Sequence, residues 1–306
     1  MTFEADASAP SAICPLTMRE ALQRVTEIEM LVRRLSEEIG TGRHRSFFSG
    51  TGTEFQEIRE YRFGDDVRAI DWNCTARFCE PYLRVFTEEH DTALYLVVDR
   101  SASGTFGSER SKDEVIFEVA VSLVFSAERW GDSAGICLFT DDIELVIPPG
   151  KGRRHTALLL NALMTYRPRS HKTDVGKTIS RLLARIPKRA LVVLLSDFDS
   201  GDFGDDMLLL SRRHEVRAIR VKDRSEYEIP DAGYLLVRDP ETGEELVVDT
   251  SDPEFRSNFE EVSAAQEAAV AGMFAGAGIR PLEVFTDGNY AASLKTYFKL
   301  GGRMAE

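Results

Sequence analysis

The chain has 306 residues, 43% of them hydrophobic, which is enough to bury a sizeable core as one large domain or two smaller ones. Acidic residues number 51 against 38 basic ones, so the net charge is −13. This balance argues against nucleic acids and anionic membranes as partners, because both require a basic face.

The chain also lacks the signals of membrane and zinc proteins. No apolar run approaches the roughly 20 residues of a membrane-spanning helix, and the N-terminus has no signal-peptide core. We therefore expect a cytoplasmic protein without membrane insertion. The four cysteines lack zinc-ligand spacing and are predicted to be reduced thiols: Cys14, Cys74, Cys79 and Cys137.

Residues 1–45 are predicted to form a disordered start followed by an amphipathic helix. Thr17 to Glu20 has the pattern of a capping box, and apolar residues then recur at helical spacing as far as Ile39. Such a helix packs on its own domain or binds a partner or a second copy. Residues 46–90 are aromatic-rich and punctuated by glycine, so we expect β-strands there rather than helix.

Residues 91–221 alternate between strand-like and helix-like patterns, which predicts an α/β domain with a mostly parallel sheet. The first helix of this region has Val115, Val119, Leu123 and Ala127 on one face. The expected strands are 93–98, 134–139, 143–147, 190–195 and 215–221, and the later helices are 154–165, 174–186 and 204–213.

The C-terminal part begins with a predicted hairpin. A Pro-Glu-Thr-Gly turn signal separates the strand-like runs 234–237 and 245–248. We expect the segment of about 222–250 to complete a small β subdomain begun by residues 46–90. Residues 251–306 are predicted to pack on the core as helix 254–275, strand 280–285 and helix 290–298.

Oxygen-bearing side chains follow two of the predicted strands. Asp99, Ser101 and Ser103 leave the first strand of the α/β domain at alternate positions, and Asp197 directly follows the strand that ends at residue 195. Thr173 stands just before a predicted helix. Loops at the carboxyl ends of parallel strands are where open α/β sheets bind ligands, and hard oxygen donors suit Mg²⁺. We therefore predict one Mg²⁺ or Mn²⁺ held by these five residues.

In this chain order the five residues resemble the metal-ion-dependent adhesion site of von Willebrand factor A domains. The resemblance implies a Rossmann-like α/β sandwich. It also implies that the hydroxyls bind the ion, that the two aspartates act largely through water, and that one coordination position stays open for an acidic residue of a partner. Lys172 and Gly104 depart from the family pattern. The Asp141-Asp142 pair follows another strand, and we interpret it as a hairpin turn.

A further series of motifs resembles the bacterial domain-of-unknown-function family 58, whose von Willebrand A-like domain follows such a block. The resemblance implies a MoxR-type AAA+ ATPase as partner. It leads to the hypothesis of a non-catalytic, Mg²⁺-dependent protein–protein interaction module in the assembly or maturation of a protein complex. The matching segments are Gly50–Phe55, Arg59–Tyr61, Gly64–Arg68, Ile70–Trp72, Thr75–Arg77, Tyr82–Phe86, Phe106–Ser108, Leu138–Asp141, Pro148–Arg153 and Leu195–Phe198.

Alternatives remain open. The sequence has no G-x-S-x-G elbow and no H-E-x-x-H motif, but a metal-dependent hydrolase could use the same ion to activate water, with His171 as base. A structural protein whose site is degenerate through Lys172 is a third hypothesis. The basic run 151–155 is interpreted as a solvated loop or an acidic-partner contact. A charged block is interpreted as an ion-pair network or an interaction surface: Asp65, Asp66, Arg68, Asp71 and Arg77.

Overall fold

The computed structural model describes residues 52–61, 70–78, 80–89, 93–108, 110–227, 229, 231–238 and 243–300. The predicted N-terminal helix lies outside these residues. So do Asp65, Asp66 and Arg68 of the charged block, and Cys14 and Cys79. Cys74 and Cys137, the two described cysteines, are not joined in a disulfide.

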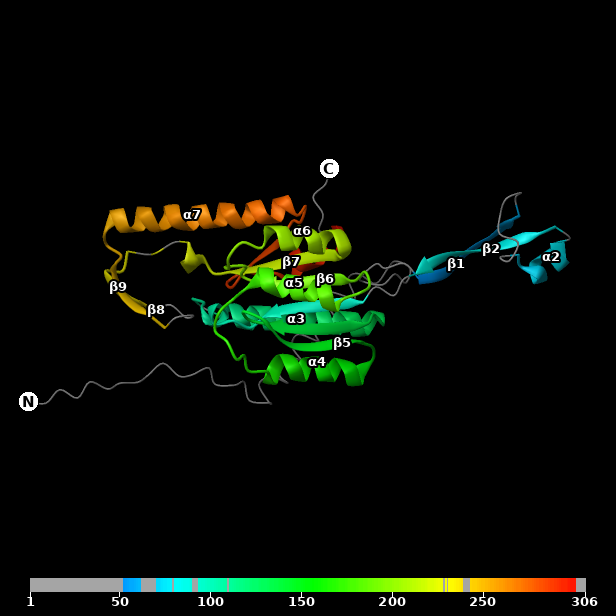
Figure 1. The fold of residues 1–306 in the computed structure, drawn as a ribbon, viewed down its shortest axis with the longest axis horizontal. Helices are drawn as coiled ribbons and strands as arrows, with labels where there is room; N and C mark the ends of the chain where they lie inside the picture. The colour runs from blue at the N-terminus through cyan, green and yellow to red at the C-terminus, as the bar shows by residue number, and fades with distance from the viewer. Residues whose placement is uncertain are drawn as a thin grey trace, which may run out of the picture.

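A six-stranded sheet forms the centre of the molecule, with the strand order β10-β7-β6-β3-β4-β5 (Figure 1). All pairs are parallel except β4 with β5, which form the hairpin predicted around Asp141 and Asp142. The mixed α/β architecture with a mostly parallel sheet is therefore confirmed. The strands are β3 (Leu94–Asp99), β4 (Ala134–Phe139), β5 (Ile143–Gly150), β6 (Leu191–Ser196), β7 (Glu215–Lys222) and β10 (Leu282–Phe285).

Helices cover both faces of this sheet, as the alternating pattern predicted. One apolar core lies between the sheet and α3, α4 and α8, and the other between the sheet and α5, α6 and α7. The four residues expected on one face of the first helix are all buried in α3. Among the described residues no helix is both long and apolar enough to cross a membrane. The helices are α3 (Lys112–Trp130), α4 (Arg153–Thr165), α5 (Val175–Arg185), α6 (Gly204–Arg213), α7 (Pro253–Gly276) and α8 (Ala291–Leu300).

Capping residues define both ends of α3. Ser111 caps its N-terminus by accepting a hydrogen bond from the backbone N–H of Glu114 (3.2 Å). Gly131 ends it with φ of 73°, a left-handed conformation that favours glycine. The first turn of α3 is thereby fixed in position beside the carboxyl ends of the strands.

Two hairpins lie outside the central sheet, and they do not form one subdomain. β1 (Gly52–Glu60) pairs with β2 (Tyr82–Glu89), and β8 (Tyr234–Arg238) pairs with β9 (Glu245–Asp249), in two separate sheets. Figure 1 draws them on opposite sides of the central sheet. The prediction that residues 46–90 and 222–250 form one β subdomain is therefore wrong for the described residues. The alternating patterns that predict strands carry no information on which distant strands pair.

A short helix, α2 (Trp72–Phe78), interrupts the segment expected to contain only strands. The backbone N–H of Cys74 donates to a side-chain oxygen of Asp71 (3.3 Å), as at a helix N-cap. Asp71 is buried, whereas Arg77 is exposed. Asp71, one member of the charged block, therefore has a structural role as the cap of α2.

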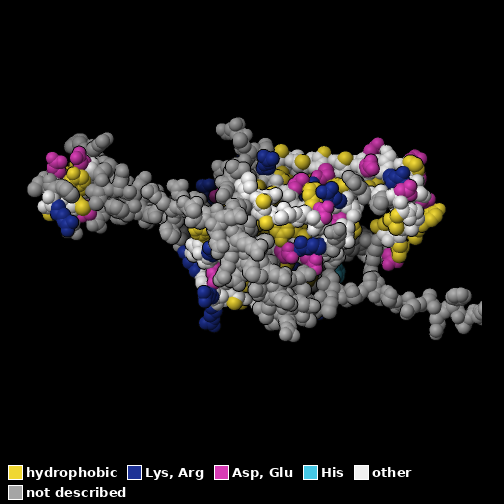
Figure 2. Space-filling model, turned by 180° about the vertical axis from the view of Figure 1, so that it is seen from behind, with side chains coloured by type: hydrophobic (Ala, Val, Ile, Leu, Met, Phe, Trp, Pro, Cys, Tyr) yellow, Lys and Arg dark blue, Asp and Glu magenta, His cyan; other side chains and the backbone are white. Residues whose placement is uncertain are grey.

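The outer hairpin β8–β9 carries large apolar side chains on its surface. Tyr234, Leu236, Leu246 and Val247 are each more than 60% exposed, and Val262 of the neighbouring helix α7 is similarly exposed. Figure 2 shows hydrophobic side chains at this end of the molecule, beside acidic ones. Large exposed apolar patches occur at protein or membrane contact sites, at ligand-binding grooves and on aggregation-prone surfaces.

His214, the residue after α6, is buried without a hydrogen-bond partner for either ring nitrogen among the described residues. Burial lowers its pKa below the ordinary 6.5, and the charges of Arg213 and Arg189 lower it further. Since the unfolded chain then binds a proton that the folded chain excludes, the free energy of unfolding should decrease as the pH falls below about 6.5.

We expect the substitution His214→Phe to reduce this acid sensitivity. The measurement is urea unfolding of the wild type and the variant between pH 5 and pH 8. The difference between the two free energies of unfolding isolates His214 from other titrating groups. A wild type and a variant with parallel pH profiles would show that His214 does not titrate on unfolding in this range.

Candidate metal centre

The site begins at the carboxyl ends of the neighbouring strands β3 and β6. Asp99 is the last residue of β3, and Ser196 is the last residue of β6, followed by Asp197. The Ser196 hydroxyl donates to Oδ2 of Asp99 (2.6 Å), while the backbone N–H of Ser101 donates to Oδ1 (2.9 Å). Pairing of β3 with β6 thus brings together residues that lie almost 100 positions apart, as the sequence predicted.

Asp99 is an unusual carboxyl group, because it is only 3% exposed and faces a second acid. Burial, and then the negative charge of Asp197, raise the pKa of Asp99 to about 7 against the opposing effect of the hydrogen bonds from Ser196 and Ser101. Two carboxylates share one end of the sheet at a cost in free energy that a cation between them would offset.

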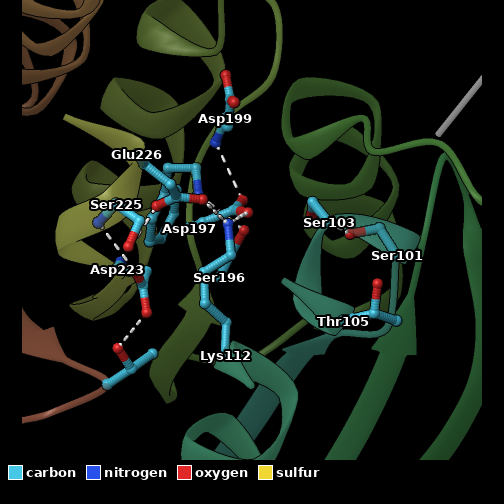
Figure 3. Close-up of polar contacts among 12 residues, drawn as sticks. Ser101, Ser103, Thr105, Lys112, Ser196, Asp197, Asp199, Asp223, Ser225 and Glu226 are labelled. Carbon is cyan, nitrogen blue, oxygen red and sulfur yellow. Dashed lines mark hydrogen bonds and ion pairs between the residues drawn. The ribbon is translucent and has the colours of Figure 1, made fainter. Parts of the chain in front are cut away.

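The two serine hydroxyls provide neutral oxygen donors beside these acids. Ser101 Oγ and Ser103 Oγ lie 2.9 Å apart, and Figure 3 shows them facing one another. In an octahedral Mg²⁺ complex with bonds of about 2.0–2.1 Å, adjacent ligand oxygens are also separated by about 2.9 Å. The spacing of these hydroxyls therefore fits two neighbouring ligands of one Mg²⁺.

The loop that contains Thr173 is fixed against the serine loop. The backbone N–H of Ala102 donates to the carbonyl of His171 (3.0 Å), and that of Asp174 donates to the carbonyl of Thr140 at the end of β4 (3.2 Å). Asp174 also caps α5 through the backbone N–H of Lys177 (2.8 Å). These bonds bring the half-buried Thr173 to the same end of the sheet as the four other predicted residues.

Asp197 has a partner that the sequence analysis missed. The ammonium of Lys112, the first residue of α3, lies 2.7 Å from Oδ2 of Asp197 and also pairs with Glu226 (Figure 3). Lys112 is only 2% exposed. Burial lowers its pKa, but the charges of Asp197 and Glu226 outweigh that effect, and the net pKa is raised. The ammonium is thus charged at neutral pH.

One sequence signal could have pointed to Lys112. A cation in the first turn of a helix opposes the helix dipole, so a lysine at this position requires a tertiary reason. By contrast, Lys172, the cation that sequence analysis singled out, is exposed, and solvent and salt screen its charge. Ser196 was also missed as a partner of Asp99, although it directly precedes Asp197.

The turn after Asp197 is held by an aromatic residue in a strained conformation. Phe198 has φ of 57°, the only positive φ of a non-glycine residue in the described part of the chain. Its backbone N–H donates to Ser196 Oγ (2.9 Å), and its buried ring packs on Phe203 and Phe274. Backbone strain of roughly 1–3 kcal/mol persists only where packing enforces it, and it concentrates at functional sites. The ring therefore fixes the turn that presents Asp197.

The donor set relies on hydroxyls as well as carboxylates. Among the described residues no group of three or more His, Cys, Asp or Glu side chains is placed to hold a metal. A cation at this end of the sheet would have two carboxylates, two serine hydroxyls and the threonine loop within its surroundings. This set fits a hard ion such as Mg²⁺ or Mn²⁺ and does not fit zinc.

The sequence is similar to a known protein family and to mycobacterial proteins. Residues 57–269 match the family described as protein of unknown function DUF58. The uncharacterized protein Rv1480 of Mycobacterium tuberculosis (strain ATCC 25618 / H37Rv) is 31% identical over 272 residues, which cover 87% of this chain and 85% of that protein. The uncharacterized protein MAV169 of Mycobacterium avium is 30% identical over 156 residues, covering 50% of this chain and 92% of that protein.

Solved structures also resemble this fold. The conserved hypothetical protein BatB from Bacteroides thetaiotaomicron aligns with a TM-score of 0.44 at 15% identity, covering 69% of this chain and 98% of that chain. Proximal thread matrix protein 1 from the mussel byssus aligns with a TM-score of 0.40 at 14% identity, covering 69% of this chain and 46% of that one.

Proposed function

Since this chain belongs to the family of unknown function DUF58, whose description states no activity, we propose a function from the site itself: a non-catalytic, Mg²⁺-dependent protein–protein interaction module. The observation that carries the proposal is the meeting of Asp99, Ser101, Ser103 and Asp197 at one end of the sheet. Their oxygens match the ligands that Mg²⁺ prefers. When bound, the ion would supply a positive charge with an open position for an acidic side chain of a partner.

The chain's own residues favour binding over hydrolysis. Activation of water requires a general base beside the ion. His171, the candidate from the sequence, is exposed and contributes its backbone carbonyl to the serine loop. Lys112 is committed to ion pairs with Asp197 and Glu226. A degenerate structural site is also less favoured, because the exposed Lys172 does not prevent the acids and hydroxyls from coming together.

The exposed hairpin β8–β9 supports an interaction role independently of the ion. Its apolar side chains would lose contact with water on binding a protein surface, at a gain of about 25 cal/mol per Å² of apolar area. The family resemblance suggests that the partner is a MoxR-type AAA+ ATPase, in the cytoplasm, acting on the assembly or maturation of a protein complex.

The first test concerns the ion. We expect the purified protein to bind one Mn²⁺ or Mg²⁺ with modest affinity in isothermal titration calorimetry, because few charged ligands would contact the metal directly. The variant Asp99→Ala should lose this binding and retain the circular dichroism spectrum of the wild type. The matched control Asp141→Ala removes an acid after the neighbouring strand β4 and should bind normally. Equal binding by the wild type and Asp99→Ala would assign the ion to another place.

The second test concerns the partner. Affinity capture from the native host, in excess Mg²⁺ or in chelator, should recover an AAA+ ATPase only with Mg²⁺. Asp99→Ala should fail to recover it, and Asp141→Ala should succeed. An AAA+ ATPase captured equally with chelator would separate the partnership from the ion.

A further inference from the structure

Lys112 is the group on which a further inference rests. It connects the candidate cation site, through Asp197, with the segment η3 (Arg224–Glu226), through Glu226. These contacts span 85 and 114 positions of the chain. A buried ammonium between two carboxylates satisfies both, but each acid competes for it.

Glu226 belongs to a turn that several hydrogen bonds hold together. One of its oxygens accepts the backbone N–H of Asp223 (3.1 Å), and Asp223 caps the turn by accepting from the backbone N–H of Ser225 (2.9 Å). Asp223 is itself held by Ser108 and by the Thr286 hydroxyl (2.5 Å). The turn is therefore anchored from several sides, and the pair of Lys112 with Glu226 joins it to the cation site.

We propose that Lys112 is a built-in counter-ion that competes with a divalent cation for Asp197 and so links occupancy of the site to the segment 223–227. This inference rests on the proposed cation site. With no divalent ion present, the ammonium neutralises Asp197. A divalent ion near the same carboxylate repels the ammonium and weakens its attraction to Asp197, which leaves Lys112 dependent on Glu226. The coupling is reciprocal, so any change that commits Lys112 to Asp197 must weaken binding of the ion.

The inference gives opposite expectations for two substitutions. Lys112→Met removes the competing charge and should tighten Mn²⁺ binding by about tenfold, or about 1.4 kcal/mol, since a like charge a few Å away repels the ion more strongly in a partly buried site than in bulk water. Glu226→Gln leaves Lys112 with Asp197 as its only charged partner and should weaken Mn²⁺ binding by a similar factor. A general loss of structure would not move affinity in both directions.

A second buried lysine provides matched controls. Lys222 of β7 is 5% exposed and pairs with Glu267 and with Glu283, without a contact to Asp197. Lys222→Met and Glu283→Gln change the same charges in the same kind of pair. Both should leave the affinity for Mn²⁺ within about twofold of the wild type, because the charges that they remove pair with acids other than Asp197.

The experiment is titration of Mn²⁺ into the wild type and the four variants, followed by electron paramagnetic resonance of the free ion. Hydrogen exchange of residues 223–227 is measured with and without Mg²⁺. We expect Mg²⁺ to change exchange of this segment in the wild type but not in Lys112→Met. If Lys112→Met does not fold, the comparison of Glu226→Gln with Glu283→Gln decides. The inference then requires that Glu226→Gln binds Mn²⁺ more weakly than Glu283→Gln does.

The outcomes separate this inference from the proposed function. Binding by the wild type with unchanged affinity in Lys112→Met and Glu226→Gln would overturn the role of Lys112 and leave the cation site standing. Binding by Lys112→Met alone would support the role of Lys112 and contradict a working site in the wild type. No binding by any of the proteins would overturn both.

Discussion

Replacing Asp99 by Asn is expected to make the cation-free protein more stable at pH 8. The folded state raises the pKa of Asp99 to about 7 from 3.8, chiefly by burial. For an acid with a raised pKa, the stabilising contribution is present at pH values below the unfolded pKa and is lost as the pH rises through the folded pKa. Ionised Asp99 at pH 8 therefore costs the folded state roughly 4 kcal/mol, which a neutral amide avoids.

Melting temperatures provide the measurement. In chelator, Asp99→Asn should melt several degrees above the wild type at pH 8, and the gap should close toward pH 4. Addition of Mg²⁺ should raise the melting temperature of the wild type but not that of Asp99→Asn, because a ligand stabilises only the protein that binds it. The control Asp141→Asn, at the end of the next strand, should keep the response to Mg²⁺. A variant less stable than the wild type at pH 8 would contradict the described environment of Asp99.

Replacing Lys112 by Met should have the opposite effect on stability. The substitution leaves Asp197 and Glu226 without their shared counter-charge at a position that is 2% exposed. Breaking a buried ion pair by removing one partner costs about 3–5 kcal/mol, because the remaining charge is buried and unpaired. We therefore expect a large decrease in the free energy of urea unfolding at pH 7.

Two comparisons identify the cause of that loss. The triple variant Lys112→Met, Asp197→Asn, Glu226→Gln removes the charges together and should recover most of the stability, since neutral groups of similar shape avoid the penalty of unpaired charge. Mg²⁺ should stabilise Lys112→Met more than it stabilises Lys222→Met, because only loss of the Lys112 ammonium tightens binding of the ion. A Lys112→Met protein as stable as the wild type would mean that the ion pair contributes nothing net.

The sequence allowed prediction of the elements that have strong local signals. The β-branched runs that end at Asp99 and Ser196 became neighbouring buried strands, and the helix predicted from Val115 to Ala127 is α3. The predicted site residues Asp99 and Asp197 lie at the same edge of the sheet because β3 and β6 pair in parallel.

Features that depend on distant contacts could not be predicted in the same way. Lys112 pairs across 85 and 114 residues, and no periodic pattern encodes such a contact. The separation of the two hairpins into different sheets could not be predicted either, because the sequences of β1–β2 and β8–β9 have the pattern of ordinary strands and do not show which strands pair. The high burial of Asp99 was also unexpected for a residue on a loop at the end of a strand.

The most direct test of the cation site is a crystal structure of the protein with Mn²⁺, recorded at the manganese absorption edge. We predict one strong anomalous peak at the carboxyl ends of β3 and β6, within bonding distance of the hydroxyls of Ser101 and Ser103 and beside Asp99 and Asp197. The same crystals prepared from Asp99→Ala should lack it. A fully occupied Mn²⁺ elsewhere on the protein, with none beside these serines, would contradict the site.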